Sequence, residues 1–134
     1  MIIMSRKKNI DSREQLEKLA PVTQAPIKRH VFVCNGKSCL AVGSADVKDA
    51  FTTELESRNL RQGKASKGRN PVGEVVLTDC GSVGFCSIGP CVLVYPEGVW
   101  YAQVDAEDVI EIVEEHLQKG NVVERLALMT ISEE

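Results

Sequence analysis

The sequence has no apolar run long enough to cross a membrane. Only four apolar residues precede the first charges at its N-terminus, too few for an export signal. Aromatic residues make up just 4% of the chain, and there are only two histidines. We therefore expect a cytoplasmic protein with no membrane partner, in a compartment where stable disulfides are rare.

Several cysteine spacings are also missing. Thioredoxin chemistry requires Cys-x-x-Cys at the start of a helix, and no such pair exists. The plant-type spacing C-x4-C-x2-C and the repeated C-x2-C of bacterial four-iron proteins are absent as well. His30 and His116 are not expected to bind metal. His116 falls in the last turn of an acidic predicted helix, where a cation interacts favourably with the helix dipole.

The net charge of −3 is unevenly distributed along the chain. Residues 74–134 hold two basic and twelve acidic side chains, a local net charge of −10. Such a surface either keeps the protein soluble or steers a basic protein partner toward it. In the second case, Asp79 and Glu97 are the acids expected nearest the cysteines. The basic stretch from Arg58 to Arg69 contains no aromatic residue, so no nucleic-acid partner is expected.

The chain divides into an extension and one domain. Residues 1–29 predict a flexible N-terminal extension, in which residues 11–20 form a short helix capped by Asp11 or Ser12. Prolines interrupt the pattern after that helix. Residues 30–134 form the predicted domain.

Hydrophobic periodicity and turn residues predict a compact order of elements within the domain. Ser44 is the expected cap of the first helix, and Asp105 that of the second. The order is β-α-β, then a hairpin, then a helix, which suits a small α/β sandwich of the thioredoxin type. The predicted strands cover residues 30–34, 74–78, 92–96, 98–104 and 122–128, and the predicted helices cover 44–60 and 105–120.

Five cysteines remain as the main chemical signal. Cys34 ends the first predicted strand and Cys39 follows in a C-x4-C pair. Cys80 follows the second strand, and Cys86 completes a C-x5-C pair. Neighbouring strands of a β-α-β unit end at the same sheet edge, so the two pairs should converge there. Four thiolates suit an iron–sulfur cluster; structural zinc or inert thiols remain alternatives.

The motifs "HVFVC", "TDC" and "GFCSIGPCVLVYPEGVWYAQV", with the final helix, resemble the thioredoxin-like [2Fe-2S] ferredoxins. This family is related to the small cluster-bearing subunit of NADH dehydrogenases and bidirectional hydrogenases. The resemblance covers about residues 29–128. It implies a thioredoxin-like fold, a small mixed sheet flanked by helices, and a [2Fe-2S] cofactor. It also implies a cis proline at Pro90, at the start of the third strand.

The resemblance further implies which residues hold the cluster: Cys34, Cys39, Cys80 and Cys86. The family's last pair is usually C-x3-C, so counting back from Cys86 places Ser82 at the third ligand position. We assign Cys80, because it directly follows the strand and thiolate binds iron better than a hydroxyl does. Cys91 occupies a usually aliphatic position. We interpret it as a small buried hydrophobe, or else as a spare ligand.

We therefore interpret the chain as a protein that shuttles single electrons between redox protein partners and is not itself an enzyme. Free-standing members of the family are typically homodimers, so a homodimer is expected. Trp100 and Tyr101 are consecutive on a strand, so one of them faces away from the core and could contact the second copy. The alternatives are an accessory subunit of a larger oxidoreductase complex and a zinc or thiol structural module.

Overall fold

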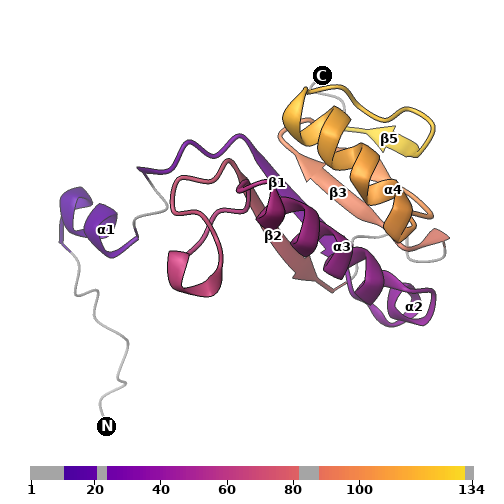
Figure 1. Cartoon of the computed structure of the whole chain (residues 1–134), viewed down its shortest axis with the longest axis horizontal. Coiled ribbons are helices and arrows are strands. Elements are labelled where there is room, and N and C mark those ends of the chain that lie inside the picture. The colour runs from indigo at the N-terminus through magenta and orange to yellow at the C-terminus, as the bar shows by residue number, and fades with distance from the viewer. Residues whose placement is uncertain (1–10, 21–23, 82–87, 132–134) are drawn as a thin grey trace, which may run out of the picture.

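The computed structural model of the chain describes residues 11–20, 24–81 and 88–131 (Figure 1). The final helix of the sequence prediction appears here as an α-helix that continues directly into π-helical turns. The elements, in order, are α1 (Arg13–Leu19), β1 (Arg29–Cys34), α2 (Lys37–Ala41), α3 (Ser44–Ser57), the 3-10 turn η2 (Ala65–Lys67), β2 (Val75–Cys80), β3 (Val92–Tyr95), β4 (Val99–Tyr101), α4 (Ala106–Glu111), the π-helical η4 (Ile112–Gln118) and β5 (Ala127–Thr130).

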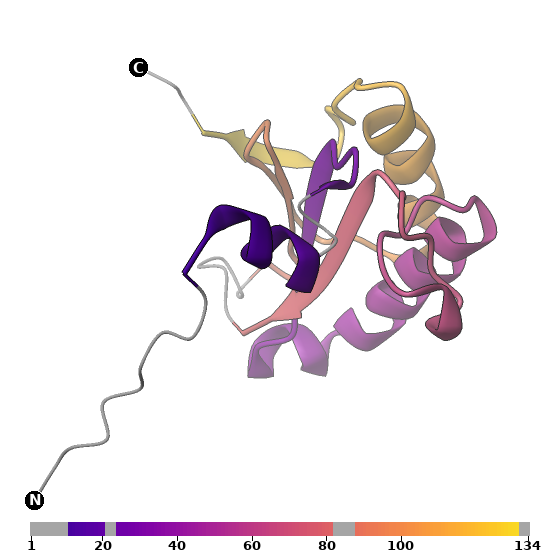
Figure 2. The same ribbon diagram turned by 90° about the vertical axis from the view of Figure 1, so that its left-hand side faces the viewer.

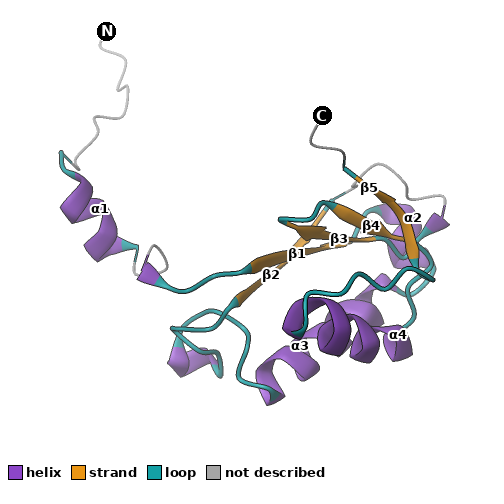
Figure 3. Cartoon of the chain, turned by 90° about the horizontal axis from the view of Figure 1, so that it is seen from above, coloured by secondary structure: helices purple, strands orange, loops and turns teal. Residues whose placement is uncertain are grey.

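Five strands form one mixed sheet in the order β2-β1-β3-β4-β5. β1 and β2 are parallel, and the other neighbours are antiparallel. Helices α3 and α4 both lie on the same face of this sheet (Figures 2 and 3). The predicted α/β class, with its small mixed sheet and flanking helices, is confirmed. No helix in the described part of the chain is long and apolar enough to span a membrane.

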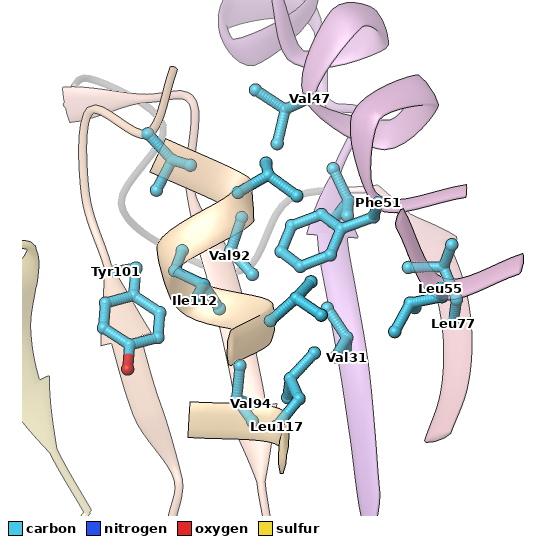
Figure 4. Close-up of a cluster of buried hydrophobic side chains, with 14 of the residues drawn as sticks. Val31, Val47, Phe51, Leu55, Leu77, Val92, Val94, Tyr101, Ile112 and Leu117 are labelled. Atoms are coloured by element: carbon cyan, nitrogen blue, oxygen red, sulfur yellow. The ribbon is translucent and has the colours of Figure 1, made fainter. Parts of the chain in front are cut away.

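The core lies between the sheet and these helices (Figure 4). Alternate residues of β1 face it, because successive side chains of a strand point to opposite sides. The helix predicted over residues 44–60 is present as α3, and its Val47, Phe51 and Leu55 are buried against the strands. Tyr101 is fully buried. The preceding residue, Trp100, lies on the other face of the sheet and is half-buried. The sheet thus has one buried face and one partly open face.

Helix α1 agrees with the sequence prediction and adds nothing to the core. The Ser12 hydroxyl caps it by accepting a hydrogen bond from the Gln15 N–H at 3.1 Å. None of its residues is buried, and Leu19 is 70% exposed. The helix therefore gains little from apolar burial.

Two expectations about the elements need correction, and one short helix was not predicted. Ser44 is not the cap of α3: Gly43 holds that position with φ 103°, and Ser44 is a buried first-turn residue. Helix α2 was not predicted, because its five residues are too short to show a period. The last strand begins at Ala127 rather than at residue 122, although the predicted segment overlaps its start.

A buried chain of hydrogen bonds fastens the β3–β4 turn to η4. The Val123 N–H donates to the Tyr101 hydroxyl at 3.0 Å, and that hydroxyl donates to His116 Nδ1 at 2.8 Å. His116 Nε2–H then donates to Glu97 at 3.0 Å, and Arg29 donates to the same carboxylate at 2.9 Å. Each polar group of this network therefore has a partner.

Burial and hydrogen bonding shift the pKa values within this network. Burial lowers the pKa of His116, which stays neutral and keeps one ring nitrogen as an acceptor. Burial opposes ionisation of Glu97, but hydrogen bonds from Arg29 and His116 outweigh it and lower the pKa of that carboxyl. Burial also raises the pKa of Tyr101 to about 12, so its hydroxyl remains a donor.

We expect Tyr101→Phe to destabilise the protein by about 1–3 kcal/mol, because it leaves a buried ring nitrogen and a buried N–H without their shared partner. Tyr95→Phe is the matched control, since Tyr95 is 37% exposed. Thermal unfolding of the two variants beside the parent measures the difference. Equal midpoints for both variants would show that the network contributes nothing to stability.

Candidate metal centre

Three cysteines lie side by side at one edge of the sheet. The parallel register of β1 and β2 pairs Cys34 with Cys80. On the other side of β1, Val33 pairs with Val92, so the next step places Cys91 opposite Cys34. The Cys34 N–H donates to the Cys91 carbonyl at 3.0 Å, which agrees with this register. The predicted convergence of the strand-end cysteines is therefore present for Cys34 and Cys80.

Cys39 reaches the same region from helix α2, two residues beyond its start. Cys34, Cys39 and Cys91 are buried together in a cluster against Ile88, separate from the main core. The prediction that Cys91 is buried is confirmed, at 1% exposed. Its neighbours are two cysteines rather than the aliphatic core, which the sequence did not indicate.

Gly89 leaves space for the Cys39 thiol. A Cβ atom placed on Gly89 would lie 2.5 Å from Cys39 Sγ, closer than real Cβ contacts allow. Gly81, directly after Cys80, has nothing within 4 Å of the corresponding position. The peptide bond from Gly89 to Pro90 is cis, as expected. A glycine is therefore required at position 89 because the Cys39 thiol packs directly against it. The sequence alone shows only another loop glycine.

The remaining predicted ligands differ in how far the structure describes them. Cys80 is half-buried, and its thiol donates to the Val33 carbonyl at 3.7 Å. Cys86 and the alternative Ser82 lie outside the described residues. Within the described ranges, no three metal-ligating side chains converge on one point. A [2Fe-2S] cluster needs four thiolates, and Cys34, Cys39 and Cys80 bring three thiols to this region, so the residues present fit that cofactor.

A polar group next to these cysteines ties both strand ends to α3. Asp79 accepts hydrogen bonds from Asn35 at 2.9 Å and from Lys48 at 3.1 Å. The Ser44 hydroxyl donates to the Asn35 side-chain carbonyl at 2.9 Å. These bonds, from Lys48 first and then Asn35, lower the pKa of Asp79. Nothing in the spacing of Asn35 and Lys48 along the sequence indicates that both contact Asp79.

The expected location of Glu97 is wrong. It was placed near the cysteines, but it binds Arg29 at the opposite end of β1. Cys34 lies five positions after Arg29, which corresponds to about 16 Å along a strand. Asp79 does lie beside the cysteines, although Lys48 partly offsets its charge. The two acids therefore belong to opposite ends of the sheet.

We expect Gly89→Ala to lower the iron content of the purified protein, because the new methyl group would displace the Cys39 thiol. Gly81→Ala adds the same methyl group in open space, also within the cysteine region, and should leave the iron content near the parent value. Iron and sulfide assays on both variants test this. Equal iron in the two variants would mean that the Cys39 position is not critical.

Comparison with known proteins identifies the family. The model of the thioredoxin-like [2Fe-2S] ferredoxin family matches residues 21–117, more than half of the chain. A [2Fe-2S] ferredoxin from Clostridium pasteurianum is 43% identical over 75% of this chain and 96% of its own length. A [2Fe-2S] ferredoxin from Aquifex aeolicus is 39% identical over 75% of this chain and 88% of its own.

A solved structure agrees with these sequence matches. The crystal structure of the wild-type thioredoxin-like [2Fe-2S] ferredoxin from Aquifex aeolicus superposes with a TM-score of 0.62 and 37% identity. The match covers 77% of this chain and 98% of the other. The chain therefore belongs to the thioredoxin-like [2Fe-2S] ferredoxin family, which confirms the cofactor and the electron-transfer role expected from the sequence.

Proposed function

We propose that Cys34, Cys39, Cys80 and Cys86 hold one [2Fe-2S] cluster, and that the protein passes single electrons between redox proteins without catalysing a reaction of its own. The observation that carries this proposal is the register of β1 and β2, which sets Cys34 and Cys80 side by side. Two relatives support a free carrier rather than a subunit of a complex. Both are ferredoxins, and this chain covers 96% and 88% of their lengths.

The chain's own residues prepare this edge for a charged cofactor. When bound, the cluster takes up and releases one electron. Burial of Cys34 and Cys39 limits the access of water to their thiolates. Lys48, whose side chain is 20% exposed, holds a positive charge beside the strand ends through its ion pair with Asp79. The polar group of Asn35, Asp79, Lys48 and Ser44 keeps the strand ends in place as the local charge changes.

The N-terminal extension is not part of this machinery in our proposal. The family match begins at residue 21, and α1 has no buried residue. Among the described residues of this region, backbone bonds to the sheet side begin with the Lys28 and Arg29 N–H groups, both of which donate to the Glu74 carbonyl. We therefore place the domain boundary near residue 29 and the working unit in residues 30–134. Five cysteines favour the reducing cytoplasm as its location.

The partly open face of the sheet supports a homodimer. Four apolar side chains form a row across four strands, through the register pairs Phe32–Leu93, Leu93–Trp100 and Trp100–Met129. Helices α3 and α4 lie on the other face (Figure 3). His30 stacks on Phe32 at 4.0 Å between ring centroids, which extends the flat apolar surface. A second copy meeting this row would bury it, as self-complementary dimer interfaces do.

We expect Met129→Glu to convert the dimer to monomers, because it places a charge within the row. Met129 is 42% exposed in the single chain, so the substitution should not disturb folding. Ile110→Glu is the matched control, since Ile110 is 45% exposed on α4, away from the row. Light scattering after size-exclusion chromatography gives the masses. A parent monomer, or a Met129→Glu dimer, would contradict the dimer through this face.

We expect Cys34→Ser and Cys39→Ser each to lose most of the bound iron and the visible absorption of the cluster. The control is a fold measurement by circular dichroism, because loss of cluster with loss of fold would be uninformative for the ligand assignment. Cys86→Ser should behave in the same way as these two. Full iron content with an unchanged spectrum in any of the three variants would remove that residue from the ligand set.

A further inference from the structure

Cys34 has a cysteine on each side of it. The sheet order places β1 between β2 and β3, so Cys80 and Cys91 flank Cys34 at the same level of the sheet. Paired residues of neighbouring strands point to the same face, with Cβ atoms about 4.5–5.5 Å apart in an antiparallel pair. The sheet therefore presents three thiols in one row where the proposed ligand set uses two.

The two flanking thiols differ in their surroundings. Cys80 is half-buried and is the last residue of β2, the strand at the border of the sheet. Cys91 is 1% exposed and packs with Cys34 and Cys39. Exposed thiols are the ones that oxidants and alkylating reagents reach first. The site thus has one accessible thiol and, on the other side of Cys34, one that is protected.

We propose that Cys91 is a reserve ligand, which takes the coordination position of Cys80 when Cys80 is lost. This inference rests on the proposed function and adds a fifth residue to its metal site. Cys91 needs no change of strand register to serve, because Cys34 and Cys39 are already its neighbours. The replacement is a ligand substitution without electron transfer. Cys91 would release its thiol proton to solvent and supply its thiolate to the iron position that the sulfur of Cys80 has left.

The test compares four variants of the full chain: Cys80→Ala, Cys91→Ala, Cys80→Ala with Cys91→Ala, and Cys80→Ala with Ser82→Ala. Alanine is chosen because a serine side chain at position 80 could itself bind iron through oxygen. Each protein is purified anaerobically, and iron, sulfide and the visible absorption spectrum are measured. Circular dichroism of each variant verifies that the fold is retained.

Cys80→Ala should keep most of its iron but show a shifted spectrum, and Cys91→Ala should match the parent in both. Combining Cys80→Ala with Cys91→Ala should remove the cluster, whereas combining it with Ser82→Ala should not. If Cys80→Ala and its combination with Cys91→Ala hold the same iron, high or low, Cys91 is not a reserve ligand. Loss of cluster in Cys91→Ala alone would equally overturn a reserve role.

These outcomes separate the inference from the ligand set of the proposed function. Cys34→Ala serves as the reference in the same series, because it removes a ligand of the proposed set that the reserve role also needs. If Cys34→Ala loses the cluster while Cys80→Ala and its combination with Cys91→Ala hold the same iron, only the reserve role fails. If Cys34→Ala keeps a full and unaltered cluster, the proposed ligand set itself is wrong, and the reserve role is wrong with it.

Discussion

The parallel pairing of β1 with β2 is the constraint on which the proposed metal site depends. It joins segments more than forty residues apart and aligns Cys34 with Cys80 at one sheet edge. The β-α-β connection makes this alignment possible, since both strands run in the same direction and end on the same side. A shift of one residue would turn one of the two thiols to the opposite face.

The two ends of the sheet have different physical characters. The cysteine end is held by hydrogen bonds among Asn35, Asp79, Lys48 and Ser44, around thiols packed in a small cluster of their own. The opposite end is held by the buried network around Glu97 and His116. This division separates the site that changes charge from the network that joins the β3–β4 turn to η4.

The two faces of the sheet are equally distinct. One is covered by α3 and α4 and contains the core (Figures 3 and 4). The other presents the row from Phe32 to Met129. The strands from β1 to β5 in this mixed sheet pair antiparallel, and antiparallel strands commonly pack one face on the core and leave the other open. In the proposed function, the cysteines at the edge hold the cofactor and the apolar row on the open face meets a second copy.

Local sequence determined the elements with strong periods or clear end signals. The spacing of Val47, Phe51 and Leu55 predicts α3, and the residues from Pro96 to Gly98 predict the hairpin turn. These features depend on neighbours in the chain, so the sequence alone is enough to find them. The family motifs pointed to the cofactor because ligand type and spacing are also local properties.

Tertiary structure decided which distant side chains meet. Glu97 follows the third predicted strand closely, yet it binds Arg29 and His116 at the end of the sheet away from the cysteines. The sequence predicts Cys91 as a small buried hydrophobic residue. The β1–β3 register places it next to Cys34, and it packs with Cys34 and Cys39. Such contacts depend on strand order and register, which come from the packing of the whole sheet, so no short stretch of sequence contains them.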